Sequence, residues 1–125
     1  MKNILVIEDD DNLRFHVCQS LRKQNFHVIA AENVRIGMQL FQEQYPDLII
    51  CDLDLPEPDG YQILEKLQVD STNGKIPVIF LISKTDEFHR QQARQLGANL
   101  WLKKPVRFNE LLWAIAIQLN KTSEK

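Results

Sequence analysis

The chain has 125 residues, of which 44% are hydrophobic and 26% charged, so its length suits one ordinary globular domain with a single core. Fifteen basic residues against 17 acidic residues give a formal charge of -2, which argues against nucleic acid or an anionic membrane as a direct partner. No run approaches the roughly 20 apolar residues that cross a bilayer, and nothing before Ile4 resembles a signal peptide. Cys18 and Cys51 both lie in apolar segments, which fits a reducing compartment, so we expect a cytoplasmic protein.

Five apolar runs rich in β-branched residues recur along the chain and predict five strands. The predicted strands are Ile4–Ile7, Val28–Ala31, Leu48–Cys51, Val78–Ile82 and Leu100–Leu102. Runs such as Leu48–Cys51 do not alternate with polar residues, as expected of strands that helices cover on both faces. This pattern is typical of parallel sheets.

Each strand is followed by a segment with helical periodicity. The predicted helices are Leu13–Lys23, Val34–Gln44, Tyr61–Gln68, Glu87–Leu96 and Phe108–Leu119. Helices between successive strands are the connections that parallel strands require. We therefore predict an α/β fold with a doubly wound, five-stranded parallel sheet and five helices. One domain is expected over residues 1–120, with residues 121–125 as a polar tail or the start of a linker.

Acidic residues directly follow two of these strands. Glu8, Asp9, Asp10 and Asp11 follow the first strand, and Asp52 follows the third. The carboxyl ends of parallel strands share one edge of a sheet, so several carboxylates should meet there and need a cation such as Mg²⁺. We interpret Asp10 or Asp11 as the cap of the next helix. Glu8 and Asp9 end a buried strand and are predicted to be functional.

Asp52 is the candidate nucleophile of this edge. A carboxylate can attack phosphorus and form an acyl phosphate when a cation neutralises charge on the transferred group. Lys104 follows the fifth strand, and its long side chain can place an ammonium group on a phosphoryl oxygen or beside Asp52. Pro105 can fix the loop that presents Lys104, whereas Lys103 is expected to be solvated.

Together these segments resemble the response-regulator receiver family over nearly the whole chain. The resemblance rests on Ile4–Asp10 (ILVIEDD), Pro46–Pro56 (PDLIICDLDLP), Asp59-Gly60, Pro77–Leu81 (PVIFL) and Lys104-Pro105. It implies a flavodoxin-like sheet of order 2-1-3-4-5 and phosphotransfer from a histidine kinase or phosphotransfer protein to Asp52. It also implies Mg²⁺ held by Asp9, Asp52 and the backbone carbonyl of Asp54, with Glu8 acting through water. Such a domain catalyses its own phosphotransfer and slow dephosphorylation and is not a turnover enzyme.

The chain departs from the family pattern at Ile82, where the family normally has a threonine or serine that bonds the incoming phosphoryl group. Ser83 is adjacent, but neighbouring strand side chains point to opposite faces, so it can replace the hydroxyl only if the strand end bends or shifts. Trp101 matches the family's switch aromatic, for which we expect a packing role here. We hypothesise that Asp52 is still phosphorylated while the conformational response is weak or differently driven.

The last predicted helix has two apolar faces. Its core stripe is Phe108, Leu111, Leu112, Ile115 and Leu119. Trp113 and Ile117 lie opposite, and this i, i+4 pair indicates either a partner surface, together with the fourth helix and fifth strand, or scattered surface hydrophobes.

Three other functions compete with this interpretation. Asp52-Leu-Asp54 resembles the paired aspartates of haloacid-dehalogenase-type phosphatases, but the chain length and Glu8-Asp9 argue against that class. A flavin or nucleotide module needs a phosphate-cradling first loop, and four acids there would repel phosphate. The remaining alternative is a degenerate receiver that acts as a phosphorylation-independent protein-interaction module, because Ile82 removes one switch element.

Overall fold

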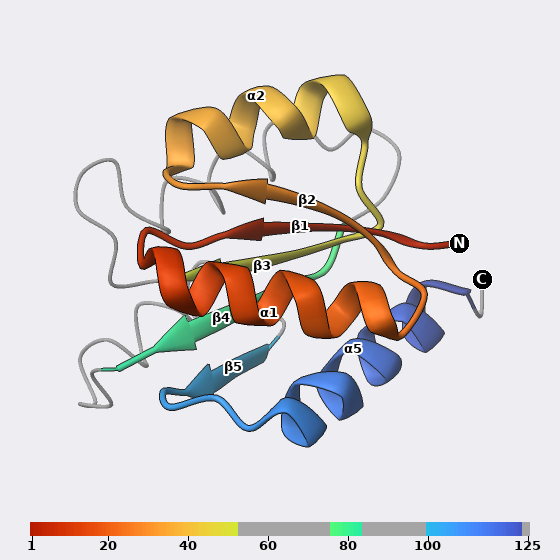
Figure 1. Cartoon of the computed structure of the whole chain (residues 1–125). Helices are drawn as coiled ribbons and strands as arrows, with labels where there is room; N and C mark the ends of the chain where they lie inside the picture. The colour runs from red at the N-terminus through yellow and green to blue at the C-terminus, as the bar shows by residue number, and fades with distance from the viewer. Residues whose placement is uncertain (53–75, 84–99, 124–125) are drawn as a thin grey trace.

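The computed structural model describes residues 1–52, 76–83 and 100–123, with side chains through Asn120. Its elements are β1 (Asn3–Ile7), α1 (Asp11–Lys23), β2 (His27–Ala31), α2 (Val34–Gln44), β3 (Leu48–Asp52), β4 (Val78–Ile82), β5 (Leu100–Lys103) and α5 (Phe108–Ser123) (Figure 1). The predicted helices Tyr61–Gln68 and Glu87–Leu96 lie outside the described residues, so the prediction of five helices remains a prediction.

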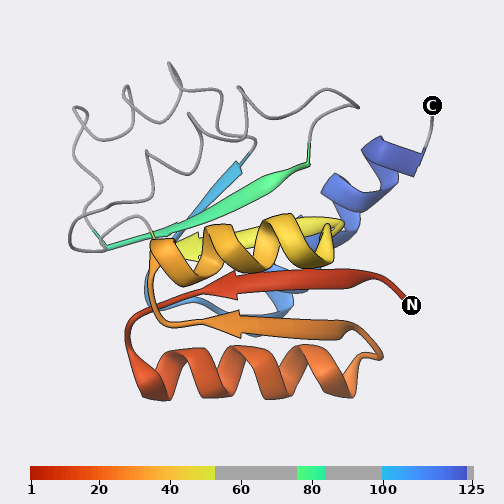
Figure 2. The same ribbon diagram turned by 90° about the horizontal axis from the view of Figure 1, so that it is seen from above.

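The five strands form one parallel sheet in the order β2-β1-β3-β4-β5, which confirms the predicted sheet and strand order. β1 and β2 run side by side in the same direction (Figure 2). The chain passes from β1 to β2 on one side and then to β3 on the other, so the winding direction reverses between β1 and β3. Ligands of such sheets bind beyond the carboxyl ends of the strands at this reversal. Glu8 directly follows β1, and Asp52 is the last residue of β3.

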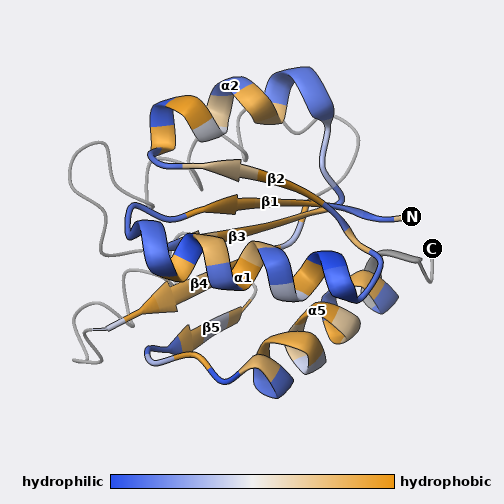
Figure 3. Cartoon of the chain, in the orientation of Figure 1, coloured by the Kyte–Doolittle hydropathy of each residue, from blue (hydrophilic) through white to orange (hydrophobic). Residues whose placement is uncertain are grey.

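Helices cover both faces of the sheet and create two apolar layers. α2 packs on one face, where Val34 and Phe41 join Leu5 and Phe80 in one buried cluster. α1 and α5 pack on the opposite face, in a second cluster. Hydrophobic residues accordingly dominate the strands, whereas the turn after β1 is hydrophilic (Figure 3). The doubly wound arrangement therefore puts polar groups at the strand ends rather than on the sheet faces.

Burial along the strands depends on their place in the sheet. β3 and β4 are buried at every position, as predicted for strands covered on both faces. β2 and β5 are the two edge strands and are partly exposed. Cys18 and Cys51 are buried in the core and form no disulfide with each other, and burial raises the pKa of the Cys18 thiol. Among the described helices, none combines the length and apolar character needed to span a membrane.

Helix ends differ from the predictions where polar groups decide them. α1 begins two residues before the predicted Leu13, because Asp10 caps it by accepting a hydrogen bond from the Leu13 amide at 2.9 Å. This confirms the capping interpretation for Asp10, while Asp11 lies in the first turn. α5 continues past the predicted end at Leu119 to Ser123 and so includes the first residues of the predicted tail.

Gly37 allows α2 to approach β1 closely at Ile7, the last residue before the acidic turn. A Cβ at this position would lie 2.8 Å from Ile7 Cγ1 and closer still to Ile7 Cδ1, and Ile7 is fully buried. We expect Gly37→Ala to lower the free energy of unfolding by on the order of 1 kcal/mol, because overpacking costs about 1–3 kcal/mol and exceeds the roughly 1 kcal/mol gain in helix propensity. Urea unfolding checks this, with exposed Gln39→Ala in α2 as the control. A Gly37→Ala variant as stable as wild type would contradict the steric argument.

Candidate functional site

Glu8 is a buried carboxyl group at the end of β1. Its amide donates to the Ala31 carbonyl at 3.0 Å, which continues the pairing of β1 with β2, and its side chain turns into the site with 1% exposure. Glu8 Oε2 accepts a hydrogen bond from the Asp10 amide at 3.1 Å. Burial raises the pKa of Glu8 to about 7, and the hydrogen bond and negative charge of Asp52 act in the same direction. The carboxylate form of Glu8 is therefore costly until a cation compensates it.

Asp52 is the last residue of β3 and is 2% exposed. It lies opposite Leu81 of β4, and its Oδ2 is 3.1 Å from Lys104 Nζ. The same ammonium nitrogen lies 3.2 Å from Glu8 Oε1. One lysine thus bridges carboxylates that end β1 and β3.

Lys104 reaches this position from the end of β5. Its amide donates to the Ile82 carbonyl at 2.9 Å, and the Lys104-Pro105 peptide bond is cis. Burial by itself lowers the pKa of Lys104, but the charges of Asp52 and Glu8 outweigh it and the pKa is raised. The ammonium group therefore stays charged at neutral pH. The adjacent Lys103 is exposed, as predicted.

Asp9 completes the acidic cluster. Glu8, Asp9 and Asp52 each offer a carboxylate oxygen, and these oxygens lie within 4.8 Å of one another. Glu8 and Asp52 are buried, whereas Asp9 is exposed and opens the cluster to solvent. The fold therefore brings Asp52, at the end of β3, to the two acids that follow β1, as the strand-end argument predicted.

The donor set fits a hard divalent cation such as Mg²⁺, which takes carboxylate oxygens together with water. Three carboxylates face the Lys104 ammonium group, which lies 3.2 Å from Glu8 Oε1 and 3.1 Å from Asp52 Oδ2, so the cluster of described residues keeps an excess of negative charge. A divalent cation would offset this excess negative charge. The Asp54 carbonyl, predicted as a further ligand, lies outside the described residues.

Arg14 is a residue of this site that sequence reasoning missed. Its Nη1 donates to the Glu8 carbonyl at 2.8 Å, and its Nη2 donates to Asp11 Oδ1 at 2.6 Å. The i, i+3 spacing from Asp11 was a detectable signal for the ion pair. The contact with a strand-end carbonyl had no sequence signal, because it depends on how α1 leaves the sheet.

The predicted switch positions lie in β4 and β5. Ile82 is 1% exposed and belongs to the apolar cluster on the α2 face, with Cys51 and Phe80. Ser83 is exposed at a bend directly after β4. Trp101 is half-buried and packs against the same apolar cluster as Ile82. An apolar side chain therefore occupies the position at which a hydroxyl was expected.

The outer face of α5 carries the predicted surface pair. Trp113 is 62% exposed, and Ile117 is half-buried. Leu111 and Ile115, on the inner side of the same helix, are buried in the core. Trp113 therefore lies on the exposed face of α5, whereas Ile117 is only partly exposed, and the partner surface itself stays a prediction.

The chain is similar to known proteins over almost its whole length. The family profile of the response regulator receiver domain matches residues 4–116. The phosphate regulon transcriptional regulatory protein PhoB of Escherichia coli is 31% identical over 122 residues, which cover 98% of this chain and 53% of PhoB. Protein PilH of Pseudomonas aeruginosa is 30% identical over 115 residues, which cover 92% of this chain and 95% of PilH. This chain thus spans about half of PhoB, and it covers 8% of a histidine kinase of Formosa agariphila that is 32% identical over 107 residues.

Solved structures show the same similarity. The signal receiver domain of a signal transduction histidine kinase from Syntrophus aciditrophicus has a TM-score of 0.91 and 26% identity, covering 100% of this chain and 95% of that chain. A response regulator from Chloroflexus aurantiacus has a TM-score of 0.87 and 26% identity, covering 95% and 98% of the two chains. From the profile match and these relatives, we conclude that this chain belongs to the response regulator receiver domain family, whose members are signalling domains of two-component systems.

Proposed function

We propose that Asp52 accepts a phosphoryl group in a Mg²⁺-dependent reaction. The observation that carries this proposal is the Lys104 ammonium group held 3.1 Å from buried Asp52 and 3.2 Å from buried Glu8, with Asp9 in the same cluster. A nucleophilic carboxylate, a fixed cationic side chain and a set of oxygen ligands are the parts that phosphoryl transfer requires. Their retention favours this function over a degenerate module that works without phosphorylation.

The chemical step uses this chain's own residues in distinct roles. A carboxylate oxygen of Asp52 attacks phosphorus while the phosphorus–nitrogen bond of a donor phosphohistidine breaks, which leaves an acyl phosphate and a free imidazole. Lys104 contacts a phosphoryl oxygen and offsets its charge. Asp9, Asp52 and the Asp54 carbonyl would hold Mg²⁺, with Glu8 acting through water. When bound, Mg²⁺ neutralises charge on the transferred group.

The partners follow from this chemistry and from the exposed face of α5. The phosphoryl donor is a histidine kinase or a phosphotransfer protein in the cytoplasm. Trp113 and Ile117 supply an apolar contact for an output partner on the face of α5. The predicted helix Glu87–Leu96, which was expected to share this partner surface with β5 and α5, lies outside the described residues. We expect no direct binding to nucleic acid or to a membrane, because the chain has a small negative charge.

Beryllofluoride, a phosphoryl mimic, tests the proposal directly. In the presence of Mg²⁺ we expect saturable amide chemical-shift changes at Glu8, Asp9 and Asp52, because the mimic binds the acceptor carboxylate. Asp52→Asn should remove them. An absence of binding by the wild-type chain would overturn the phosphoacceptor proposal and favour the degenerate module.

The same titration tests how Ile82 affects the response. Buried Ile82 offers no hydroxyl to a phosphoryl oxygen, and a hydrogen bond to a charged group contributes about 1.5–3 kcal/mol, which is comparable with allosteric coupling energies. We expect the amide shifts to stay near the acidic cluster, with little change in Trp101 or Trp113 fluorescence. Large changes that extend through α5 would show a conventional conformational switch and contradict the weak-coupling hypothesis.

A further inference from the structure

Asp9 has little support of its own in the cation site. It is exposed, and among the described residues no side chain or amide forms a hydrogen bond with its carboxylate. Glu8 and Asp52 are held by burial and by Lys104, whereas the place of Asp9 depends on the backbone between Glu8 and Asp11. Whatever fixes that turn therefore decides whether Asp9 stands within reach of the other two carboxylates.

The Arg14 guanidinium group spans this turn. Its two terminal nitrogens donate to groups on either side of Asp9 and Asp10, at 2.8 Å to the Glu8 carbonyl and at 2.6 Å to Asp11 Oδ1. The Arg14 side chain is 20% exposed, so the contact with Glu8 is shielded from solvent on one side. Arginine suits this task because its planar fork directs two donors in fixed directions, which a lysine ammonium cannot do.

The charge of Arg14 acts against a cation at the site. Arg14 contacts the backbone carbonyl of Glu8, one of the cluster residues, and like charges repel. If charge were the whole effect of Arg14, its removal would strengthen Mg²⁺ binding. If its two hydrogen bonds hold the turn in place, its removal would weaken Mg²⁺ binding. The two roles therefore predict changes of opposite sign.

We propose that Arg14 is a positioning residue for the cation site: by joining the Glu8 carbonyl to Asp11, it holds the turn between β1 and α1 so that Asp9 faces Glu8 and Asp52. This inference rests on the proposed function of the acidic cluster. Arg14 itself touches neither the cation nor the phosphoryl group. Residues that hold metal ligands in place typically change metal affinity by about 10–100-fold when they are replaced.

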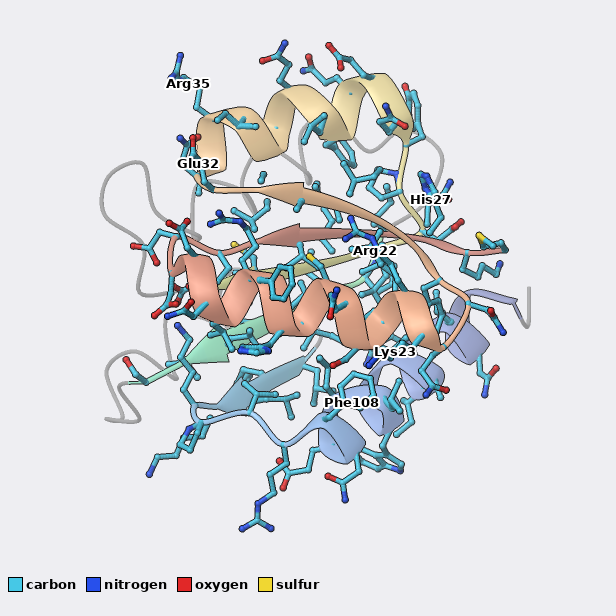
Figure 4. All side chains as sticks on the ribbon, in the orientation of Figure 1. Arg22, Lys23, His27, Glu32, Arg35 and Phe108 are labelled. Carbon is cyan, nitrogen blue, oxygen red and sulfur yellow. The ribbon has the colours of Figure 1, made fainter. Side chains whose placement is uncertain are left out.

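Mg²⁺ titration of three folded variants tests the proposal, with backbone amide shifts of Glu8, Asp9 and Asp52 as the readout. We expect Arg14→Gln and Arg14→Lys each to weaken Mg²⁺ binding about tenfold. Arg22→Gln is the matched control, because Arg22 lies near the other end of α1 and donates to the Val28 carbonyl at 3.1 Å, away from the cluster (Figure 4). Arg22→Gln loses the same kind of hydrogen bond and the same charge, and it should bind Mg²⁺ like wild type.

A second readout needs no metal. The Asp10 and Leu13 amides are hydrogen-bonded within the turn, so the Arg14 variants should lose hydrogen-exchange protection there while the strands keep theirs. Unchanged or tighter Mg²⁺ binding by Arg14→Gln would overturn the positioning role and leave the proposed function intact. Wild-type Mg²⁺ affinity in Arg14→Lys would also overturn the positioning role, since a single ammonium group would then hold the turn as well as the two-donor guanidinium group does. A wild-type chain that binds no Mg²⁺ would overturn the proposed function together with this inference.

Discussion

Asp52→Asn is expected to abolish phosphorylation of the chain by a small-molecule donor. The asparagine amide is nearly isosteric with the carboxylate but is a far weaker nucleophile, so no acyl phosphate forms. The fold should survive the replacement, because Lys104 keeps Glu8 as a partner at 3.2 Å. The replacement also removes one of two neighbouring buried carboxylates, which relieves their mutual repulsion.

Incubation with acetyl phosphate and Mg²⁺, followed by intact-mass measurement, checks this expectation. The wild-type chain should gain the mass of one phosphoryl group, and Asp52→Asn should gain none. Asp10→Asn is the matched control, because Asp10 lies at the same edge and asparagine is an equally good helix cap. Labelling that persists in Asp52→Asn, or that is lost in Asp10→Asn, would show that another carboxylate is the acceptor.

Lys104→Met is expected to destabilise the metal-free chain strongly. Lys104 Nζ is the ammonium group shared by Glu8 and Asp52, which are 1% and 2% exposed. Methionine preserves much of the side-chain volume but leaves buried Asp52 without a positive partner, while Glu8, whose pKa is already raised to about 7, takes up a proton. Removing one side of a buried ion pair costs about 3–5 kcal/mol, so we expect a loss of that order in the free energy of unfolding.

Urea unfolding in the presence of a chelator measures this loss. Lys103→Met is the matched control, because Lys103 is adjacent in sequence but exposed, and it should change the free energy of unfolding by no more than about 0.5 kcal/mol. Added Mg²⁺ should recover part of the stability of Lys104→Met, because a cation that binds only the folded state stabilises it by mass action. Equal stability of the two lysine variants would mean that Lys104 does not neutralise the cluster.

Strand positions were predictable because apolar composition specifies them. Val78–Ile82 was predicted with its observed bounds, and the other strands differ by one residue at an end. α2 was also predicted from Val34 to Gln44, where Asn33 caps one end and Tyr45 adopts a left-handed conformation at the other. The predicted end of α5 at Leu119 was wrong. The segment Asn120–Ser123 is polar and has no hydrophobic periodicity, although its backbone continues the helix.

The acidic residues of the candidate site were predictable because they lie at or directly after the ends of predicted strands. Glu8 and Asp52 follow or end buried strands, and parallel strands place those ends at one edge. That Lys104 bridges both carboxylates was not predictable, because this depends on where β5 ends relative to β1 and β3. The Arg14 contact was missed for the same reason, since its acceptor is a backbone carbonyl that carries no sequence identity.

The sequence by itself determined the fold class, the strand order through its family resemblance, and the candidate chemical groups, because hydrophobic periodicity and strand-end residue types are properties of the linear chain. Only the tertiary structure decided how those groups interact. Burial raises the pKa of Glu8 because β1 ends inside the protein, and Lys104 stays charged because two carboxylates from other strands surround it. Desolvation and ion pairing depend on distances in space, which residues distant in sequence acquire only when the sheet forms.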